Sequence, residues 1–232
     1  MKNKNIFIAV DTSSLKNTKK IINQIKTNKL NIIPKFGLQF FYSKIGRVFL
    51  QNFKEEFWLD LKINDIPQTA LSALNSLRDL KKCKYITVHA NGGLEMLRAV
   101  KKKAKKINKN LKVLGVTVLT SLNDKSLREI GHTKKVGKIV LKQADLIKKA
   151  GLHGIVCSAG QEAKMIRKKY KNFFIVTPGI RLPGDKTDDQ SRVVTPYDAL
   201  VKNKVSAIVM GRSLIRGNIK NNLKKLIDHL NQ

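Results

Sequence analysis

The stretch Trp58-Leu59-Asp60-Leu61-Lys62-Ile63-Asn64-Asp65-Ile66-Pro67 leads from an apolar segment into charged residues and stops at a proline. With the preceding Phe57, its first residues form the run Phe57–Leu61, which predicts a strand that is buried on both faces, as in a parallel sheet. Asp60 and Lys62 stand two positions apart, so their side chains leave the same face of that strand. The carboxyl end of the strand therefore presents a carboxylate and an ammonium group together.

Similar apolar, β-branched runs recur along the chain and alternate with amphipathic, lysine-rich segments. The expected strands are Ile6–Val10, Ile32–Phe36, Phe57–Leu61, Tyr85–Val88, Val113–Leu119, Gly154–Cys157, Phe173–Val176 and Ala207–Met210. The expected helices are Ser14–Ile25, Leu38–Asn52, Ile66–Leu80, Leu94–Ile107, Gln143–Ala150, Gln161–Lys169, Tyr197–Lys202 and Ile219–Leu230. Ser14 and Thr195 suit helix caps, and Pro196 suits a first helical position.

This alternation predicts an α/β fold built as a single (β/α)8 TIM barrel. Dividing 232 residues among eight units leaves about 29 residues for each, which is the compact end of that fold. No linker rich in Pro, Gly or Ser divides the chain, so we expect one domain over residues 1–232. A doubly wound open sheet is the structural alternative.

The net charge is +31, from 47 basic and 16 acidic residues, which raises the question of a nucleic acid or an anionic membrane as partner. The lysines are spread over the whole chain, and the densest cluster, Lys101–Lys106, lies in an expected helix as a solvated face. Aromatic residues are not interleaved with the basic clusters as a stacking surface requires. We therefore expect no specific nucleic-acid partner. A basic nucleic-acid-binding protein on a degenerate barrel is the alternative, and it requires a contiguous basic face.

The sequence predicts neither export nor membrane insertion. The apolar run Ile6–Val10 is too short for a signal peptide, and uncharged stretches such as Val113–Asn123 are well short of the roughly 20 apolar residues of a membrane span. Two cysteines, Cys83 and Cys157, give no disulfide framework and no short-spaced metal cluster. We expect a cytoplasmic protein with no membrane contact.

Polar or glycine residues follow the apolar runs at their carboxyl ends, where a barrel of this kind has its mouth. They are Asp11, Lys35, Asp60, Lys62, His89, Thr120, Ser158, Thr177, Gly211 and Arg212. Charges that are buried at such a mouth need partners, and Lys35 and Asp65 are available to the pair Asp60 and Lys62. The alternating array indicates either a catalytic centre or a structural ion pair that fills the barrel.

Two glycine-containing segments follow the last two strands. Thr177-Pro178-Gly179-Ile180-Arg181 comes after the seventh run, and Met210-Gly211-Arg212-Ser213 comes after the eighth. In this fold those loops usually bind phosphate, because glycine lets the backbone approach and arginine adds a bidentate fork. A solvated glycine turn is the alternative interpretation. We expect His89 to be a structural histidine and Cys157 to be a core thiol.

The residues from Asp60 to Thr69 carry the pattern D-x-K-x-x-D-I-P-x-T. Further motifs follow in the order Val88–Gly93, Val116–Ser121, Val156–Ala159, Thr177–Arg181, Asp189-Gln190 and Gly211-Arg212. With them the chain resembles orotidine 5′-phosphate decarboxylase of the bacterial type over nearly its whole length. It departs from the family at Ile63-Asn64, often Phe-His, and at Gln68, often Asn, but no charged position is replaced.

The resemblance implies a carbon–carbon lyase that converts orotidine 5′-phosphate to UMP, the last step of de novo pyrimidine nucleotide biosynthesis, without a metal or other cofactor. It implies that Lys62 donates a proton to C6 of the pyrimidine and that Asp60 lies beside the departing carboxylate. Lys35 and Asp65 complete the charge array in the family, and Lys35 with Asp11 contacts the ribose hydroxyls.

The resemblance also implies how the remaining groups of the substrate are bound. Thr120 or its neighbour Ser121 contacts the base. The residues that close over the phosphate are Arg181, Gln190, Gly211 and Arg212. Asp65 and Thr69 enter the site of the neighbouring subunit, which implies a homodimer with shared active sites.

A sugar-phosphate enzyme of the same superfamily, such as hexulose-phosphate synthase, is the nearest alternative. Those relatives share the Asp-x-Lys-x-x-Asp core but use magnesium and an enediolate. The continuation Ile66-Pro67-Gln68-Thr69 and Gln190 favour the pyrimidine nucleotide. Activity that survives a chelator would exclude the magnesium enzyme.

Overall fold

Eight parallel strands close into a barrel in the computed structural model of the protein, which describes residues 5–185 and 193–231. The strands are β1 (Asn5–Ala9), β2 (Asn31–Gly37), β3 (Phe57–Ile63), β4 (Cys83–His89), β5 (Lys112–Val116), β6 (Gly154–Val156), β7 (Phe174–Thr177) and β8 (Ala207–Met210). β1 pairs with β2 on one side and with β8 on the other, which closes the sheet. The (β/α)8 TIM barrel is therefore confirmed, and the doubly wound open sheet is wrong.

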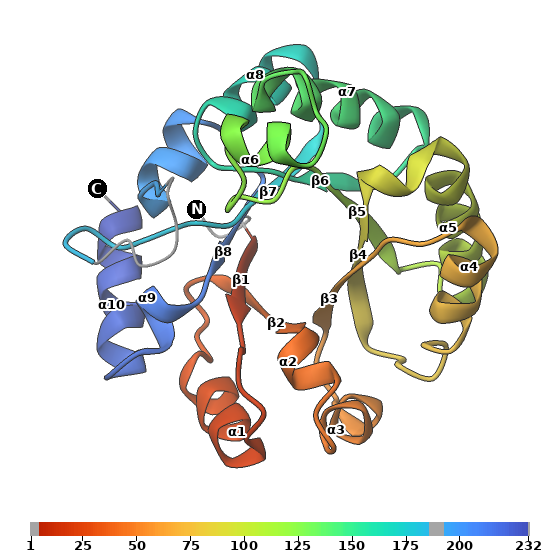
Figure 1. Cartoon of the computed structure of the whole chain (residues 1–232). Coiled ribbons are helices and arrows are strands. Elements are labelled where there is room, and N and C mark those ends of the chain that lie inside the picture. The colour runs from red at the N-terminus through yellow and green to blue at the C-terminus, as the bar shows by residue number, and fades with distance from the viewer. Residues whose placement is uncertain (1–4, 186–192, 232) are drawn as a thin grey trace.

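Helices surround the strands on the outside of the barrel (Figure 1). The longer ones are α1 (Leu15–Gln24), α3 (Gly46–Asn52), α4 (Pro67–Asn75), α5 (Gly93–Ile107), α7 (Val136–Lys149), α8 (Gln161–Lys169) and α10 (Ile219–Leu230). The shorter ones are α2 (Leu38–Phe41), α6 (Asp124–Glu129), α9 (Arg212–Ile215), η1 (Ala90–Gly92) and η2 (Asp198–Lys202). Ser14 caps α1 as expected, since its side chain accepts a hydrogen bond from the N–H of Asn17 at 3.3 Å.

Several boundaries differ from the sequence expectation for local physical reasons. Segment 38–52 forms two helices rather than one, and Gly46 at the start of the second packs so tightly that a Cβ there would lie 1.8 Å from the carbonyl oxygen of Phe40. Helix α7 begins seven residues before Gln143, because Val136, Ile139 and Val140 already continue its buried face. Helix α6 was not expected, and β5 ends three residues earlier than predicted.

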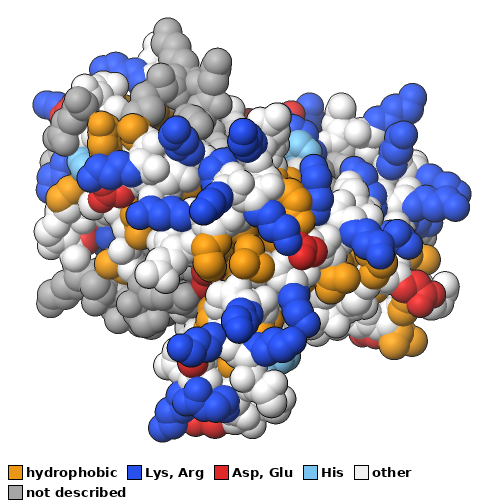
Figure 2. All heavy atoms as spheres, turned by 90° about the horizontal axis from the view of Figure 1, so that it is seen from above, with side chains coloured by type: hydrophobic (Ala, Val, Ile, Leu, Met, Phe, Trp, Pro, Cys, Tyr) orange, Lys and Arg blue, Asp and Glu red, His pale blue; other side chains and the backbone are white. Residues whose placement is uncertain are grey.

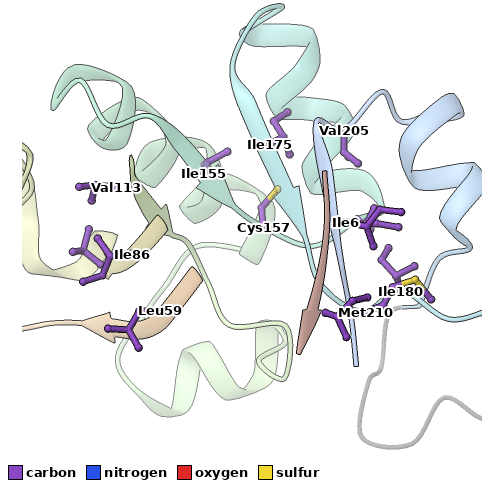
Figure 3. Close-up of a cluster of buried hydrophobic side chains, with 14 of the residues drawn as sticks. Ile6, Leu59, Ile86, Val113, Ile155, Cys157, Ile175, Ile180, Val205 and Met210 are labelled. Carbon is purple, nitrogen blue, oxygen red and sulfur yellow. The ribbon is translucent and has the colours of Figure 1, made fainter. Parts of the chain in front are cut away.

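The apolar strands are buried on both faces because the barrel has two hydrophobic layers. In β1, Ile6 and Ile8 pack in the layer between strands and helices, whereas Phe7 and Ala9 point into the barrel interior. Figure 3 shows the outer layer around Ile6, to which the strands contribute side chains such as Leu59, Ile86 and Val113. The non-alternating apolar runs of the sequence follow from this arrangement.

Aromatic rings fill the barrel interior. The ring of Phe7 meets Trp58 edge-on, with the ring centres 4.7 Å apart, and meets Tyr85 in the same way at 5.1 Å. These contacts give a rigid interior, because edge-to-face pairs add to the burial of large rings. Trp58 also lines the cavity at the carboxyl ends of the strands, so the aromatic packing supports that cavity from below.

Basic side chains are distributed widely over the surface. On the face shown in Figure 2, Lys and Arg side chains are scattered across the whole width, with apolar and acidic side chains between them. This face does not form the single contiguous basic surface that the nucleic-acid alternative requires. Within residues 5–185 and 193–231, no helix is long and apolar enough to cross a membrane.

Candidate active site

A cavity of about 490 Å³ lies at the carboxyl ends of the strands. The predicted site residues that line it are Asp11, Lys35, Asp60, Lys62, Thr120, Arg181, Gly211 and Arg212. Apolar side chains complete the wall, among them Trp58, Val116 and Val209 from the barrel interior. A few polar groups that converge on a largely apolar cavity are typical of a small-molecule site.

Asp60 lies at the centre of a charged wall of this cavity. Its Oδ2 accepts hydrogen bonds from the Nζ of Lys35 at 3.1 Å and from the Nζ of Lys62 at 3.0 Å. Its Oδ1 accepts a hydrogen bond from the hydroxyl of Thr87 at 2.8 Å. The Nζ of Lys35 also lies 4.0 Å from Oδ1 of Asp11. Four charges of alternating sign therefore follow one another across the ends of three neighbouring strands.

The charge array keeps Asp60 ionised although the residue is only 7% exposed. Burial acts to raise the pKa of this carboxyl group, but the charges of Lys35 and Lys62, with hydrogen bonds to the carboxylate, outweigh burial and lower the pKa to about 2. Burial acts in the opposite direction on Lys35, where the charges of Asp60 and Asp11 prevail and raise the pKa. Both groups are charged at neutral pH.

Lys62 reaches Asp60 through an irregularity in β3. The pairing of β3 with β4 shifts register between Leu59 and Ile63, where three residues of β3 face one residue of β4, Thr87. Within this bulge Lys62 takes the left-handed backbone conformation, with φ of 51°, and its N–H donates to Oγ1 of Thr87 at 2.9 Å. The predicted meeting of Asp60 and Lys62 is confirmed, but a bulge produces it rather than the regular alternation of a strand.

A second wall of the cavity comes from the segments after β7 and β8. Gly179 has a φ of 76°, a conformation that suits glycine, and it lines the cavity together with Pro178. Arg181 is 8% exposed, and one of its terminal nitrogens donates to the carbonyl of Ile180 at 3.1 Å. Arg212 lines the same cavity, so the two predicted guanidinium groups do lie in one site.

Not every predicted site residue lies in this cavity. Asp65 and Thr69 are exposed and do not line it, and Oδ1 of Asp65 accepts a hydrogen bond from the N–H of Ile66 at 2.8 Å. The array within one chain therefore contains Asp11 in place of Asp65. Of the two residues expected at the base, Thr120 lines the cavity and the exposed Ser121 does not. Gln190 lies outside the described residues.

His89 and Cys157 have the structural character that we expected. Nδ1 of His89 accepts the N–H of Asn91 at 3.3 Å and caps η1, and burial together with the charge of Lys62 lowers the pKa of His89. Cys157 is buried beside the cavity, and burial together with Glu162 raises the pKa of its thiol, which stays protonated. The protonated thiol of Cys157 is therefore not a nucleophile at neutral pH.

Thr87 and Trp58 belong to the site although their sequence patterns were not interpreted in that way. Thr87 stands in the run Tyr85–Val88, where a β-branched residue is simply typical of a strand. Trp58 precedes the charged pair and belongs to the same strand pattern. The two-residue spacing of Trp58 and Asp60 indicates a shared face, so the role of Trp58 in the wall could have been derived from that alternation.

Comparison with known proteins identifies the family. The family model described as "Orotidine 5'-phosphate decarboxylase / HUMPS family" matches residues 4–225. The orotidine 5′-phosphate decarboxylase of Erythrobacter litoralis is 37% identical over 211 residues, which cover 90% of this chain and 91% of that protein. The enzyme of the same name from Malacoplasma penetrans is 35% identical over 232 residues, covering 98% of this chain and 97% of that protein.

A solved structure gives the same result at the level of the fold. The crystal structure of orotidine 5′-phosphate decarboxylase from Lactobacillus acidophilus superposes with a TM-score of 0.81 at 28% sequence identity, over 99% of this chain and 100% of that chain. The charge array on three neighbouring strands and the arginine-bearing wall thus occur in a chain whose length, sequence and barrel all match these proteins. The chain belongs to the orotidine 5′-phosphate decarboxylase / HUMPS family.

Proposed function

We propose that the cavity is the active site in which this protein converts orotidine 5′-phosphate to UMP and carbon dioxide, with Lys62 as the proton donor and without a cofactor. This reaction is the last step of UMP biosynthesis. The observation that carries the proposal is the position of Asp60, a buried, ionised carboxylate that shares one oxygen between the ammonium groups of Lys35 and Lys62.

The charge array supports a direct decarboxylation. When the bond from C6 to the carboxylate breaks, the electron pair remains on C6, and the pyrimidine offers that carbanion no ordinary electron sink. The ammonium of Lys62 attracts the carbanion more than the substrate, because the negative charge on C6 exists only after carbon dioxide departs. Lys62 then transfers a proton to C6, which gives UMP, and its partly exposed side chain regains a proton from water.

Asp60 acts on the substrate side of the same step. A carboxylate held beside the substrate carboxylate repels it, and this repulsion ends when carbon dioxide leaves. Enzymes lower such barriers by about 8–23 kcal/mol, which is more than one carboxylate and one lysine supply. Arg181, Arg212 and Gln190 on the phosphate, and Asp11 with Lys35 on the ribose, provide the remote binding energy that holds the substrate in this position.

The pyrimidine base fits the apolar part of the cavity. We assign Thr120 to the base, since its side chain lines the cavity and that of Ser121 does not. Trp58 and the valines of the interior supply the apolar surface that a flat ring requires. Residues 1–232 act as one catalytic unit in this proposal.

Replacement of Lys62 by alanine tests the proton donor. Lys62→Ala is expected to lower kcat by roughly 10²–10⁴-fold, which is the usual contribution of a positioned acid, measured as loss of orotidine 5′-phosphate by ultraviolet absorbance. Lys204→Ala is the matched control, because Lys204 has the same left-handed backbone, with φ of 52°, and precedes β8 at the other end of the barrel. Its kcat should equal that of the unchanged protein.

Equal rates in the Lys62→Ala variant and the unchanged protein would remove Lys62 as the donor. The same assay with a chelator separates this reaction from that of a magnesium-dependent relative. Under the proposal the chelator leaves the rate unchanged, because two ammonium groups and not a metal ion compensate the charge of Asp60. A rate that disappears with the chelator and returns with magnesium would favour the sugar-phosphate enzyme.

The surface beside the cavity supports a homodimer with shared active sites. Leu38 and Tyr42 follow β2 and are 47% and 75% exposed, and Ile66 follows β3 and is 67% exposed. Large exposed apolar side chains at the ends of neighbouring strands mark a protein interface. Asp65 and Thr69 flank Ile66 in sequence and are also exposed, so a second copy on this surface would receive them into its cavity.

The proposed location is the cytoplasm, because its reducing conditions suit the free thiols of Cys83 and Cys157.

A further inference from the structure

The hydroxyl of Thr87 connects the backbone of the β3 bulge to the charged wall of the cavity. It accepts the N–H of Lys62 at 2.9 Å and donates its proton to Oδ1 of Asp60 at 2.8 Å. The direction of the second bond is fixed, because an ionised carboxylate only accepts. Thr87 therefore contacts both members of the reactive pair, one through the main chain and one through the side chain, while it is completely buried itself.

The bulge needs such a partner. Between Leu59 and Ile63 the regular ladder with β4 is interrupted, since three residues of β3 face Thr87 alone and their N–H groups cannot all follow the regular pairing. A buried N–H without a partner is unfavourable, and a left-handed lysine adds backbone strain. The Thr87 hydroxyl satisfies this N–H and so stabilises the conformation that turns the Lys62 side chain toward Asp60.

We propose that Thr87 is a positioning residue for the decarboxylation, which fixes Lys62 and Asp60 relative to each other before the substrate binds. The inference depends on the proposed roles of those two residues. Thr87 does not line the cavity, so it acts through its neighbours and not on the substrate. Loss of its hydroxyl leaves the phosphate and ribose contacts in place and lets the bulge relax, which separates the ammonium group from the position where C6 needs it.

A purely structural role for Thr87 makes different predictions. A buried threonine whose hydroxyl bond serves only the fold is replaced by valine with a loss of stability and no specific loss of turnover. Thr117 is the matched control for this case, because it is completely buried and its hydroxyl donates to the carbonyl of Val156 at 3.0 Å, away from the charge array. Thr117→Val removes a buried hydroxyl from the barrel without touching Lys62 or Asp60.

The experiment compares Thr87→Val, Thr87→Ser and Thr117→Val with the unchanged protein. We expect Thr87→Val to lower kcat by about 10- to 100-fold, with KM for orotidine 5′-phosphate changed by less than about threefold and the Kd of UMP unchanged. Thr87→Ser keeps the hydroxyl and should recover most of kcat. Thr117→Val should lower Tm and leave kcat within about threefold.

Several outcomes would overturn the inference. They are a kcat for Thr87→Val equal to that of the unchanged protein, a fall in kcat that Thr117→Val reproduces, and a Thr87→Ser variant as slow as Thr87→Val. If Thr87→Val does not fold, Thr87→Cys replaces it, since a thiol has nearly the shape of a hydroxyl but is a weak hydrogen-bonding group. Thr87→Cys should then be at least about 10-fold slower than Thr87→Ser, and equal rates would contradict the proposal.

Lys62→Ala, measured in the same assay, separates this inference from the proposed function. Where the unchanged protein decarboxylates the substrate and Lys62→Ala does not, the proton donor stands, and a fast Thr87→Val variant removes only the positioning role. Where Lys62→Ala is as fast as the unchanged protein, the proposed mechanism itself fails, and Thr87 then has no reactive lysine to position.

Discussion

One carboxylate oxygen of Asp60 accepts hydrogen bonds from both Lys35 and Lys62, and this sharing couples the three residues. Removing Lys35 or Lys62 would leave a buried negative charge with half of its compensation, whereas removing Asp60 would leave the buried ammonium of Lys35 near that of Lys62, with only the more distant Asp11 as an acidic partner. Substitutions at these three positions therefore have effects that do not add. The site behaves as a unit, and a change in one member alters the charge environment of the others.

The stability of the protein should depend on the ionisation of Asp60. Its pKa of about 2 in the folded protein lies below the ordinary value of 3.8, so the ionised group stabilises the fold at pH values above about 4. This contribution of about 2 kcal/mol is lost as the pH falls from about 4 to about 2. Urea unfolding of the unchanged protein and of Asp60→Asn should show a stability difference that shrinks by that amount between pH 6 and pH 2. A difference that is constant over this range would contradict the assignment.

The sequence predicted the position of those site residues that lie at the ends of strands. Asp11, Lys35 and Asp60 follow or end apolar runs, and a barrel brings such residues to one mouth. The place of Thr87 was not predictable, because its role depends on a register shift between two strands that no local pattern reveals. Asp65 differs for another reason: the proposed partner of its carboxylate belongs to a second chain.

At the scale of whole elements, the strands were predicted better than the helices. Most strands contain a short apolar run that is buried on both faces, so the amino-acid composition of the run is enough to predict a strand. Helix α6 is six residues long and is held by its Asn123 cap, whose side chain accepts from Ser126 N–H at 3.0 Å, and so short a segment has no helical period to recognise. The close packing of the strands also explains why β6 begins with a glycine.

Gly154 should not tolerate a side chain. A Cβ at this position would lie 2.4 Å from the carbonyl oxygen of Phe174 in the paired strand β7, and a backbone atom there cannot move without disturbing the sheet. Gly154→Ala is expected to lower Tm by roughly 2–12 °C, from the usual cost of overpacking. Gly160→Ala is the control, because no atom lies within 4 Å of the added Cβ. Equal Tm values for the two variants would show that β6 and β7 are not in such close contact.

The whole molecule carries a large net positive charge, whereas its cavity is lined by side chains of both positive and negative charge. A net charge of +31 attracts an anionic nucleotide from a distance, an effect that weakens as salt screens it. The same charge opposes the association of two copies. The proposed homodimer would therefore depend on the exposed apolar side chains Leu38, Tyr42 and Ile66, and salt should favour it.

A charge placed in that apolar surface should separate the subunits of the proposed homodimer. Ile66→Glu is expected to give a monomer in sedimentation velocity, with activity that rises with protein concentration as the dimer re-forms. Ile130→Glu is the control, since Ile130 is 62% exposed but lies at the end of α6, and this variant should remain dimeric and active. A fully active monomer would show that one chain completes the site alone.

The closure of the barrel between β1 and β8 has a consequence for the synthesis of the protein. The charged wall of the cavity comes from a segment near the start of the chain, from Asp11 to Lys62, whereas Arg181 and Arg212 come from its last quarter. A growing polypeptide on the ribosome thus carries its reactive groups long before it has the groups that we assign to the phosphate. The two walls of the cavity meet only when the final strand has emerged and joined the first, so we expect a fragment that lacks β8 to have no complete cavity.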